Sequence, residues 1–370
     1  MKKVLFISNT ANFSKFNRPL MKWFKKQDWQ VDYCSAGEET VTECDNHYIV
    51  CITRKPFNLR NIRGYLEVKK ILSRNNYDLI HCHTPMGGVI GRLASKSLRK
   101  KGNLKVVYTA HGFHFYKGAP LKNWLLYYPM EKWLAHYTDV IITINNEDYG
   151  RAKKLSKKCV VYKINGVGID LTKFYPNKSF SEKIQYRIEN GYSPEDFIIL
   201  YTAEFIPRKN HKLLFEILPS LKQQIPELKV ILCGSGDLLE TYKQISLQNK
   251  MDYIEFTGYT KEVAVYCRMS DILVMTSFQE GLPMAMIEAI ATGLPVVASN
   301  IRGHSDVIEN GVNGFLFNLK SSRDFEDKII QLYNNEELRS EMGKRNIDIS
   351  QNYSSNLIVE NMANVYKSLF

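Results

Sequence analysis

The sequence has no long hydrophobic run. No stretch of 18 uncharged apolar residues occurs among its 370 residues, and the most apolar window, residues 281–299, still contains a glutamate, two prolines and two glycines. A transmembrane helix requires about 20 predominantly apolar residues in a row, so the sequence predicts no membrane span. The apolar run after Met1 stops after four residues and no cleavage site follows, which argues against a signal peptide.

Motifs of several other protein classes are also absent. There is no Walker loop, which argues against an NTPase. Gly234-Ser-Gly236 follows an apolar run, as a dinucleotide fingerprint would, but Leu239 stands where the third glycine is needed, which argues against NAD. The seven cysteines are odd in number and form no Cys-x-x-Cys pair. We therefore expect reduced core cysteines and a cytoplasmic protein.

Apolar runs alternate with helical patterns along the whole chain, as in a parallel sheet covered on both faces. The expected strands are Val4–Ser8, Val31–Cys34, Tyr48–Ile52, Leu79–Cys82, Val106–Ala110, Val140–Ile144 and Val160–Ile164, then Ile198–Thr202, Val230–Cys233, Ile254–Thr257, Ile272–Thr276, Val296–Ser299 and Phe315–Phe317. A glycine-punctuated stretch, 165–176, separates the two series. We predict an α/β protein with two doubly wound domains, 1–172 and 173–352, and a C-terminal helix, 353–370, that returns to the first domain. Ligands are expected beyond the carboxyl ends of the strands.

Charge is unevenly distributed between the two halves. Residues 1–175 carry 30 Lys and Arg against 13 Asp and Glu, whereas residues 176–370 carry 20 against 25. A basic half suggests contact with an anionic surface, either nucleic acid or anionic lipid. The alternative is that the lysine-rich helices simply present solvated faces.

Two carboxylates stand out in the stretch 271–299, which reads as strand, turn, helix, turn and strand. Glu280 lies at the strand exit, and Glu288 lies on the helix predicted over Met284–Ala291, about 7.5 Å further along its axis. Pro283 suits the first helical position. Carboxylates beside the positive end of a helix suit a ligand with neighbouring hydroxyls and an anion, as in a sugar nucleotide. Taken singly, each carboxylate could equally be an ordinary solvated residue.

The Glu280-x7-Glu288 pair within Ser277-Phe-Gln-Glu-Gly-Leu-Pro283 resembles the signature of glycosyltransferase family 4. The resemblance implies a retaining enzyme of the GT-B fold, with two Rossmann-like domains facing each other across a cleft. It also implies that Glu280 holds hydroxyls of the donor sugar, with Gly281 and Leu282 beside it, and that Glu288 holds the ribose.

Arg208 and Lys209 follow the first strand of the second series and could grip a diphosphate, although a solvated loop would contain the same residues. Lys209 matches a family lysine on the diphosphate, whereas Ala203-Glu204 replaces the family's Gly-Arg pair; Arg208 is a candidate substitute for that arginine. Gly234 and Gly236 would let the backbone approach a phosphate or base.

Four histidines lie in two polar loops of the first half, His81 and His83 in one and His111 and His114 in the other. No carboxylate joins them and the chain lacks the Asp-x-Asp pair of metal-dependent GT-A transferases, so we predict no metal and no cofactor. His111 matches the family histidine beside the donor sugar. Asn12, His83, His111 and His114 are the predicted acceptor-side residues, and His111, Glu280 and Lys209 the predicted catalytic ones.

The sequence thus predicts a glycosyltransferase that moves a hexose or N-acetylhexosamine from a UDP-sugar to a lipid-linked, polyprenyl-diphosphate saccharide in surface polysaccharide (capsule or exopolysaccharide) biosynthesis. It would work as a peripheral protein on the anionic inner face of the cell membrane. The alternatives are a sugar-nucleotide epimerase or phosphorylase of the same architecture and, more remotely, a non-catalytic nucleic-acid-binding protein suggested only by the basic half. That half carries no recognisable nucleic-acid motif, so no nucleic-acid partner is expected.

Overall fold

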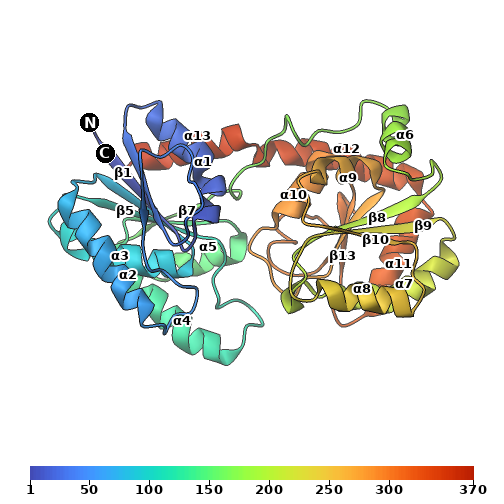
Figure 1. The fold of residues 1–370 in the computed structure, drawn as a ribbon, viewed down its shortest axis with the longest axis horizontal. Helices are drawn as coiled ribbons and strands as arrows, with labels where there is room; N and C mark the ends of the chain where they lie inside the picture. Colours follow the sequence, from blue (N-terminus) through green and yellow to red (C-terminus); the bar gives the residue numbers. More distant parts are fainter. The chain divides into compact units, whose positions relative to one another are not determined.

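A computed structural model describes all 370 residues, which form two compact units (Figure 1). The first unit comprises Met1–Gly168 together with Ser355–Phe370, and the second comprises Ile169–Ser354. The division falls after Gly168 rather than after residue 172, because the Ile169 side chain is buried in the core of the second unit and its N–H donates to the carbonyl of Tyr353 at 2.8 Å.

The first unit is built on a seven-stranded parallel sheet with the order β3-β2-β1-β4-β5-β6-β7. Its strands are β1 (Lys3–Ile7), β2 (Gln30–Ser35), β3 (Asn46–Ile49), β4 (Leu79–His83), β5 (Lys105–Ala110), β6 (Val140–Thr143) and β7 (Val160–Lys163). Leu5 and Ile7 belong to one hydrophobic cluster while Val4 and Phe6 belong to another, so both faces of the sheet are buried. The strand order reverses direction between β1 and β4, which makes that pair the topological switch point.

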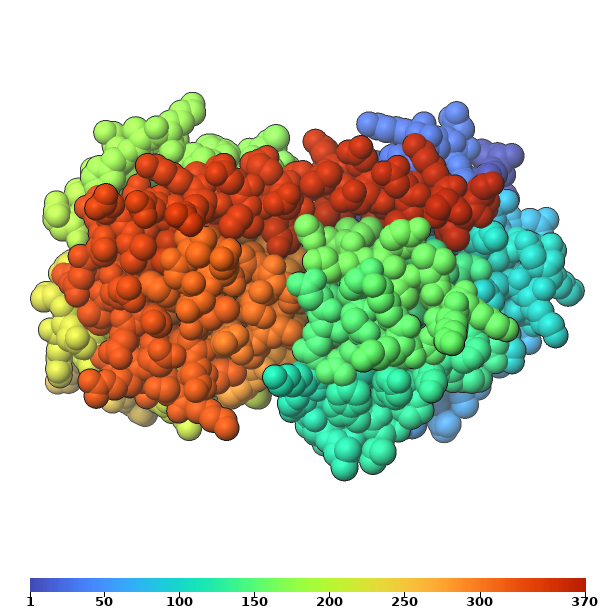
Figure 2. All heavy atoms as spheres, turned by 180° about the vertical axis from the view of Figure 1, so that it is seen from behind, coloured from blue at the N-terminus to red at the C-terminus, as the bar shows by residue number.

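Helices cover both faces of this sheet. They are α1 (Ser14–Lys25), α2 (Arg60–Arg74), α3 (Pro85–Lys100), α4 (Leu121–Leu134), α5 (Asn146–Ala152) and α13 (Ser355–Lys367), with the short 3-10 helices η1 (Ala11–Phe13) and η2 (Ala135–Tyr137). The C-terminal helix α13 packs against α1, and Figure 2 shows its dark red spheres beside the blue N-terminal segment.

The second unit is built on a six-stranded parallel sheet with the order β10-β9-β8-β11-β12-β13, so its switch point lies between β8 and β11. The strands are β8 (Phe197–Thr202), β9 (Leu228–Cys233), β10 (Ile254–Gly258), β11 (Ile272–Met275), β12 (Val296–Ser299) and β13 (Gly314–Phe317). The helices are α6 (Phe180–Glu189), α7 (His211–Gln224), α8 (Leu239–Gln248), α9 (Val263–Met269), α10 (Met284–Ala291), α11 (Ser322–Tyr333) and α12 (Glu336–Ser350), with η3 (Pro207–Lys209) and η4 (Gln351–Tyr353).

The structure corrects one local expectation. Pro283 is the N-cap of α10 rather than its first helical residue, since its ψ of 118° is extended. No helix combines the length and the apolar character that a membrane span needs.

Candidate active site

Two charged loops meet at the switch point of the second unit. Lys209 ends η3, directly after β8, and Glu280 lies in the loop between β11 and α10. Lys209 Nζ lies 2.6 Å from Glu280 Oε1, and Arg208 Nη1 lies 3.2 Å from Glu280 Oε2. The structure therefore joins three residues that the sequence placed in separate motifs.

The environment keeps Glu280 charged. Burial would raise the pKa of this carboxyl group, but Lys209 and then Arg208 hold the pKa below its usual value. Arg208 also donates to the carbonyl of Gln279 at 2.7 Å, while much of its side chain stays exposed. The site consequently combines a fixed, buried carboxylate with a buried ammonium and an accessible guanidinium.

The loop that carries Lys209 is fixed to the end of β11 by partly buried hydrogen bonds. The hydroxyls of Tyr201 and Thr276 both donate to the Lys209 carbonyl. Asn210 has a left-handed backbone (φ 54°), and its side-chain amide donates to the Thr276 carbonyl at 3.2 Å. The neighbouring strands β8 and β11 therefore present their carboxyl-end residues as one unit, which the linear sequence does not reveal.

Close packing between two loops near this site explains the presence of Gly234 and Gly236. A Cβ on Gly234 would lie 1.9 Å from the Ala203 carbonyl oxygen, and one on Gly236 would lie 2.6 Å from that of Phe205. Both glycines also have positive φ angles, 152° and 144°. The tight approach of the loops after β9 and β8 thus requires these glycines, and their contact with a donor stays a prediction.

Three further predicted residues lie on the segment that follows Glu280. Gly281 contacts the loop after β12 so closely that a Cβ on Gly303 would come within 2.6 Å of the Gly281 carbonyl oxygen. Leu282 packs against the core of the second unit. Glu288 is half-buried on α10, as predicted, and its charge helps to raise the pKa of the Cys267 thiol, although burial is the larger cause.

His304, in the loop after β12, is a further residue of this site, and the sequence predicted no individual role for its side chain. It is fully buried, and burial lowers its pKa to about 4 although Glu280 acts in the opposite direction. Its Nδ1–H donates to the Ser299 carbonyl at 2.9 Å, while Nε2 is buried without a hydrogen-bond partner. The electrostatic coupling to Glu280 is visible only in three dimensions.

The first unit brings two of the predicted histidines together at its own switch point. His83 ends β4 and His111 follows β5, with His83 Nδ1 3.2 Å from His111 Nε2. Burial lowers the pKa of His111 to about 4 and that of His83 well below its usual value. Both rings are therefore neutral near pH 7, and Phe13 of η1 lies against each of them at 4.9 and 5.5 Å between ring centroids.

The remaining histidines and Asn12 have different surroundings, and the His81 ring lies against that of His83, with 3.9 Å between the ring centroids. The His114 ring stacks on Tyr127 of α4, and Asn12 donates to Glu39 at an exposed position. His81 is fully buried, between Thr109 and the hydroxyl of Tyr366 in α13. Nowhere do three or more His, Cys, Asp or Glu side chains group in a way that could hold a metal ion.

Comparison with known proteins agrees with this geometry. The chain matches the family model "Glycosyl transferases group 1" over residues 182–348 and "Glycosyl transferase 4-like" over residues 3–145. It is 39% identical to "Putative glycosyltransferase EpsD" of Bacillus subtilis (strain 168), over 99% of this chain and 97% of that one. The chain therefore belongs to the group 1, family 4-like glycosyltransferases and is an enzyme of that class, which confirms the resemblance drawn from the Glu280–Glu288 motif.

Two more distant matches are informative. The chain is 27% identical to the UDP-Gal:alpha-D-GlcNAc-diphosphoundecaprenol alpha-1,3-galactosyltransferase of Escherichia coli, over 77% of this chain and 74% of that one. Its fold matches the structure of Anabaena Alr3699/HepE, solved with UDP and glucose, with a TM-score of 0.80, 19% identity and complete coverage of both chains. The likeness in fold confirms the predicted GT-B class with two Rossmann-like domains.

Proposed function

We propose that this enzyme transfers a hexose or N-acetylhexosamine from a UDP-sugar to a lipid-linked, polyprenyl-diphosphate saccharide in surface polysaccharide biosynthesis, with retention at the anomeric carbon. The observation that carries the proposal is the cluster of Glu280, Lys209 and Arg208 at the switch point of the second unit. The substrate class is supported by the E. coli relative, whose name gives a UDP-sugar donor and a diphosphoundecaprenol acceptor.

The charges of the cluster suit the demands of the reaction. The bond between the anomeric carbon and the β-phosphate oxygen breaks, and UDP leaves with the electron pair. The acceptor oxygen forms the new bond to that carbon, and its proton passes to the departing diphosphate. Lys209 and Arg208 would stabilise the negative charge that develops on the leaving group. Glu280, held as a carboxylate, would accept hydrogen bonds from sugar hydroxyls through its remaining lone pairs, and Glu288 would do the same for the ribose.

Thermal unfolding with UDP, GDP, ADP, NAD and several UDP-sugars tests the donor assignment. A ligand at about a hundred times its dissociation constant should add about 2.7 kcal/mol to the unfolding free energy. Selective stabilisation by UDP compounds, much reduced in Glu288→Ala and in Lys209→Met, is expected. Stabilisation by NAD alone, or by no nucleotide, would contradict the proposal.

The reaction products distinguish a transferase from an epimerase or phosphorylase of the same architecture. A transferase releases UDP from a UDP-sugar only when a lipid-linked saccharide is added, whereas an epimerase would release UDP, or change the sugar, without one. Nuclear magnetic resonance of the anomeric proton of the product distinguishes retention from inversion.

The acceptor would be reached from an anionic bilayer through the first unit. Helix α4 exposes Leu121, Leu125 and Trp133 by 73%, 71% and 50%, at spacings that place them along one face. Lys122 and Lys132 on the same helix are also exposed. In Figure 2 the blue-green spheres of this segment stand at the lower edge of the first unit, with no other segment in front of them. Apolar side chains flanked by lysines suit the interface of an anionic membrane. Equal co-sedimentation with anionic and with zwitterionic vesicles would contradict this part of the proposal.

A further inference from the structure

The second unit contains a pocket at the opposite edge of its sheet from Glu280. Its volume is about 370 Å³, within the range of small-molecule sites. Ser270 and Asp271, directly before β11, and Leu294 and Pro295, directly before β12, form part of its wall. Because the strands are parallel, these residues mark the amino ends of β11 and β12, whereas Glu280 and His304 follow their carboxyl ends. The pocket is therefore separate from the proposed donor site.

Arg268 of α9 lines this pocket with unsatisfied hydrogen-bond donors. The residue is only 8% exposed, and its Nε and Nη1 are buried with no hydrogen-bond partner. The rings of Tyr175 and Tyr186 lie 4.4 and 4.5 Å from the guanidinium carbon. The rings cover the faces of the guanidinium group but cannot satisfy its N–H groups. Nε–H and Nη1–H point to different sides of the group, and each can donate a charge-assisted hydrogen bond to a phosphate or carboxylate oxygen.

Beside Arg268 the pocket offers one unsatisfied acceptor. The amide of Asn177 donates to the Arg268 carbonyl at 2.8 Å, while its own Oδ1 is buried without a partner. A buried polar atom without a partner is unfavourable, and here donors and an acceptor are left unpaired together. A ligand that carries both an anionic group and a hydroxyl or ammonium would satisfy a donor of Arg268 and the acceptor of Asn177 together.

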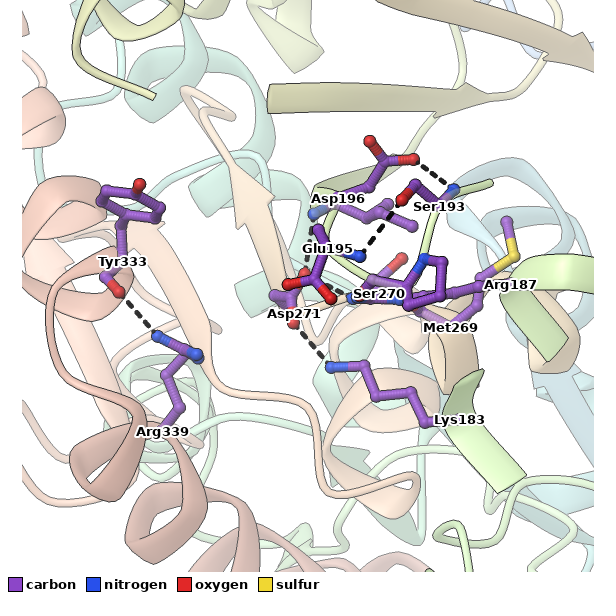
Figure 3. A network of polar contacts seen from close by, with 12 residues as sticks. Lys183, Arg187, Ser193, Glu195, Asp196, Met269, Ser270, Asp271, Tyr333 and Arg339 are labelled. Atoms are coloured by element: carbon purple, nitrogen blue, oxygen red, sulfur yellow. Dashed lines mark hydrogen bonds and ion pairs between the residues drawn. The ribbon is translucent and has the colours of Figure 1, made fainter. Parts of the chain in front are cut away.

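The other charged groups of the lining are largely committed to internal partners (Figure 3). Lys183 lies 2.6 Å from one oxygen of Asp271, whose second oxygen binds Arg187 at 2.6 Å and the N–H of Ile198 at 2.7 Å. Arg339 donates to the carbonyl of Tyr333 at 2.8 Å. Of the remaining two charged groups, Glu336 is exposed, and Lys344 is exposed without an ion pair. Arg268, Lys344 and the N–H groups of Arg339 other than Nη1 are therefore the cationic groups available to a ligand.

We propose that this pocket binds a small organic anion, with a phosphate or carboxylate oxygen accepting a hydrogen bond from one of the unsatisfied N–H groups of Arg268, at Nε or at Nη1. Lys344 adds positive charge at the rim, and Asn177 Oδ1 accepts from a hydroxyl or ammonium group of the same ligand. The site is independent of the donor chemistry, since none of its residues belongs to the Glu280 cluster.

Calorimetric titration of the full-length enzyme with inorganic phosphate and, separately, with citrate tests the proposal. Saturable binding at one site is expected, and the stronger of the two probes assigns a phosphorylated or a polycarboxylate ligand. Arg268→Met should weaken binding about tenfold or more, since a charge-assisted hydrogen bond is lost. Arg208→Gln should leave it unchanged. Loss of phosphate binding in Arg208→Gln would instead assign the anion to the donor site and overturn the proposal.

A second pair of variants keeps the test decisive if Arg268→Met does not fold. Lys344→Gln removes a charge from the rim, whereas Arg345→Gln removes the same charge from the next residue of α12, which is exposed and does not line the pocket. Binding should weaken about threefold in the first variant and remain at the wild-type level in the second. No saturable binding of either anion, or equal effects of the two variants, would overturn the proposal. A crystal grown in the preferred anion should show it against the edge of Arg268.

Discussion

Glu280 and Lys209 form a largely buried ion pair, with side-chain exposures of 8% and 13%. Removing one partner of such a pair leaves a buried charge uncompensated. We predict that Glu280→Gln and Lys209→Met each lower the unfolding free energy by about 3 kcal/mol. Because both changes break the same contact, the double variant should lose clearly less than the sum. Urea unfolding of the four proteins measures this coupling, and additive losses would contradict it.

His211 is a second residue in an unfavourable environment, because its polar ring is buried among apolar groups. It is 1% exposed, lies between the rings of Tyr201 and Phe205 at 4.6 and 4.2 Å, and neither ring nitrogen has a hydrogen-bond partner. Burial, followed by the charge of Lys209, lowers its pKa to about 3. Between about pH 6.5 and pH 3 the unfolded chain therefore binds a proton at this histidine and the folded chain does not. The free energy of unfolding consequently decreases as the pH falls through this range.

We predict that His211→Phe raises the unfolding free energy by about 1 kcal/mol at pH 7, because it removes two unsatisfied nitrogens while keeping an aromatic ring. The gain should grow as the pH falls below about 6.5, because phenylalanine takes up no proton in the unfolded state. Urea unfolding at a series of pH values checks both statements. A gain that shrinks on acidification would show that the histidine is protonated in the folded protein.

At the scale of elements, α13 closes one face of the first unit. Its Ile358, Met362, Val365 and Tyr366 belong to the hydrophobic cluster that includes Phe6 and Phe24. The Tyr366 hydroxyl lies 2.7 Å from His81 Nδ1, and burial lowers the pKa of His81 to about 3. A neutral His81 can accept at Nδ1 and donate from Nε2 to Thr109, so the helix also fixes the orientation of a strand histidine.

We predict that Tyr366→Phe lowers the stability of the first unit by about 1 kcal/mol and that Tyr366→Ala lowers it by about 4 kcal/mol, since the second change also opens a cavity. All four tryptophans, at positions 23, 29, 124 and 133, belong to the first unit, so their fluorescence reports on that unit alone. Both variants should shift the tryptophan transition in urea. A shift confined to far-UV circular dichroism would place the damage in the second unit.

The elements themselves could be predicted because the chemistry that forms them is local. Buried parallel strands appear as short apolar runs, so every expected strand has a counterpart; Val296–Ser299 and the helix Met284–Ala291 have the predicted bounds. One edge strand was located less well, since β3, predicted at Tyr48–Ile52, lies at Asn46–Ile49 and is only half-buried.

The candidate site could be predicted only in part, because its contacts are long-range. Glu280, Lys209 and Arg208 were each found from a local motif, but the ion pairs join residues 71 or more positions apart. No individual role was predicted for the side chains of His304 and Tyr366, since a single histidine or tyrosine in a sequence reads as an ordinary residue. Arg268 was missed in the same way, because an unsatisfied donor can be recognised only once its neighbours are known.

At the scale of the whole molecule, the two units differ in charge. The first unit carries 30 Lys and Arg against 13 Asp and Glu, and the second carries 20 against 25. Binding to an anionic bilayer through the first unit should therefore have an electrostatic part that salt screens, in addition to the apolar part supplied by α4. The two parts can be separated by experiment.

We predict that Leu125→Gln weakens binding to anionic vesicles at every salt concentration, because it removes an exposed apolar side chain from the contact face of α4. Leu247→Gln is the matched control, since Leu247 is 80% exposed on α8 of the second unit, compared with 71% for Leu125. Raising the salt concentration should weaken wild-type binding, and the residual binding at high salt should be lost first in Leu125→Gln. Equal effects of the two leucine variants would exclude α4 as the membrane contact, and salt-independent binding would exclude the electrostatic part.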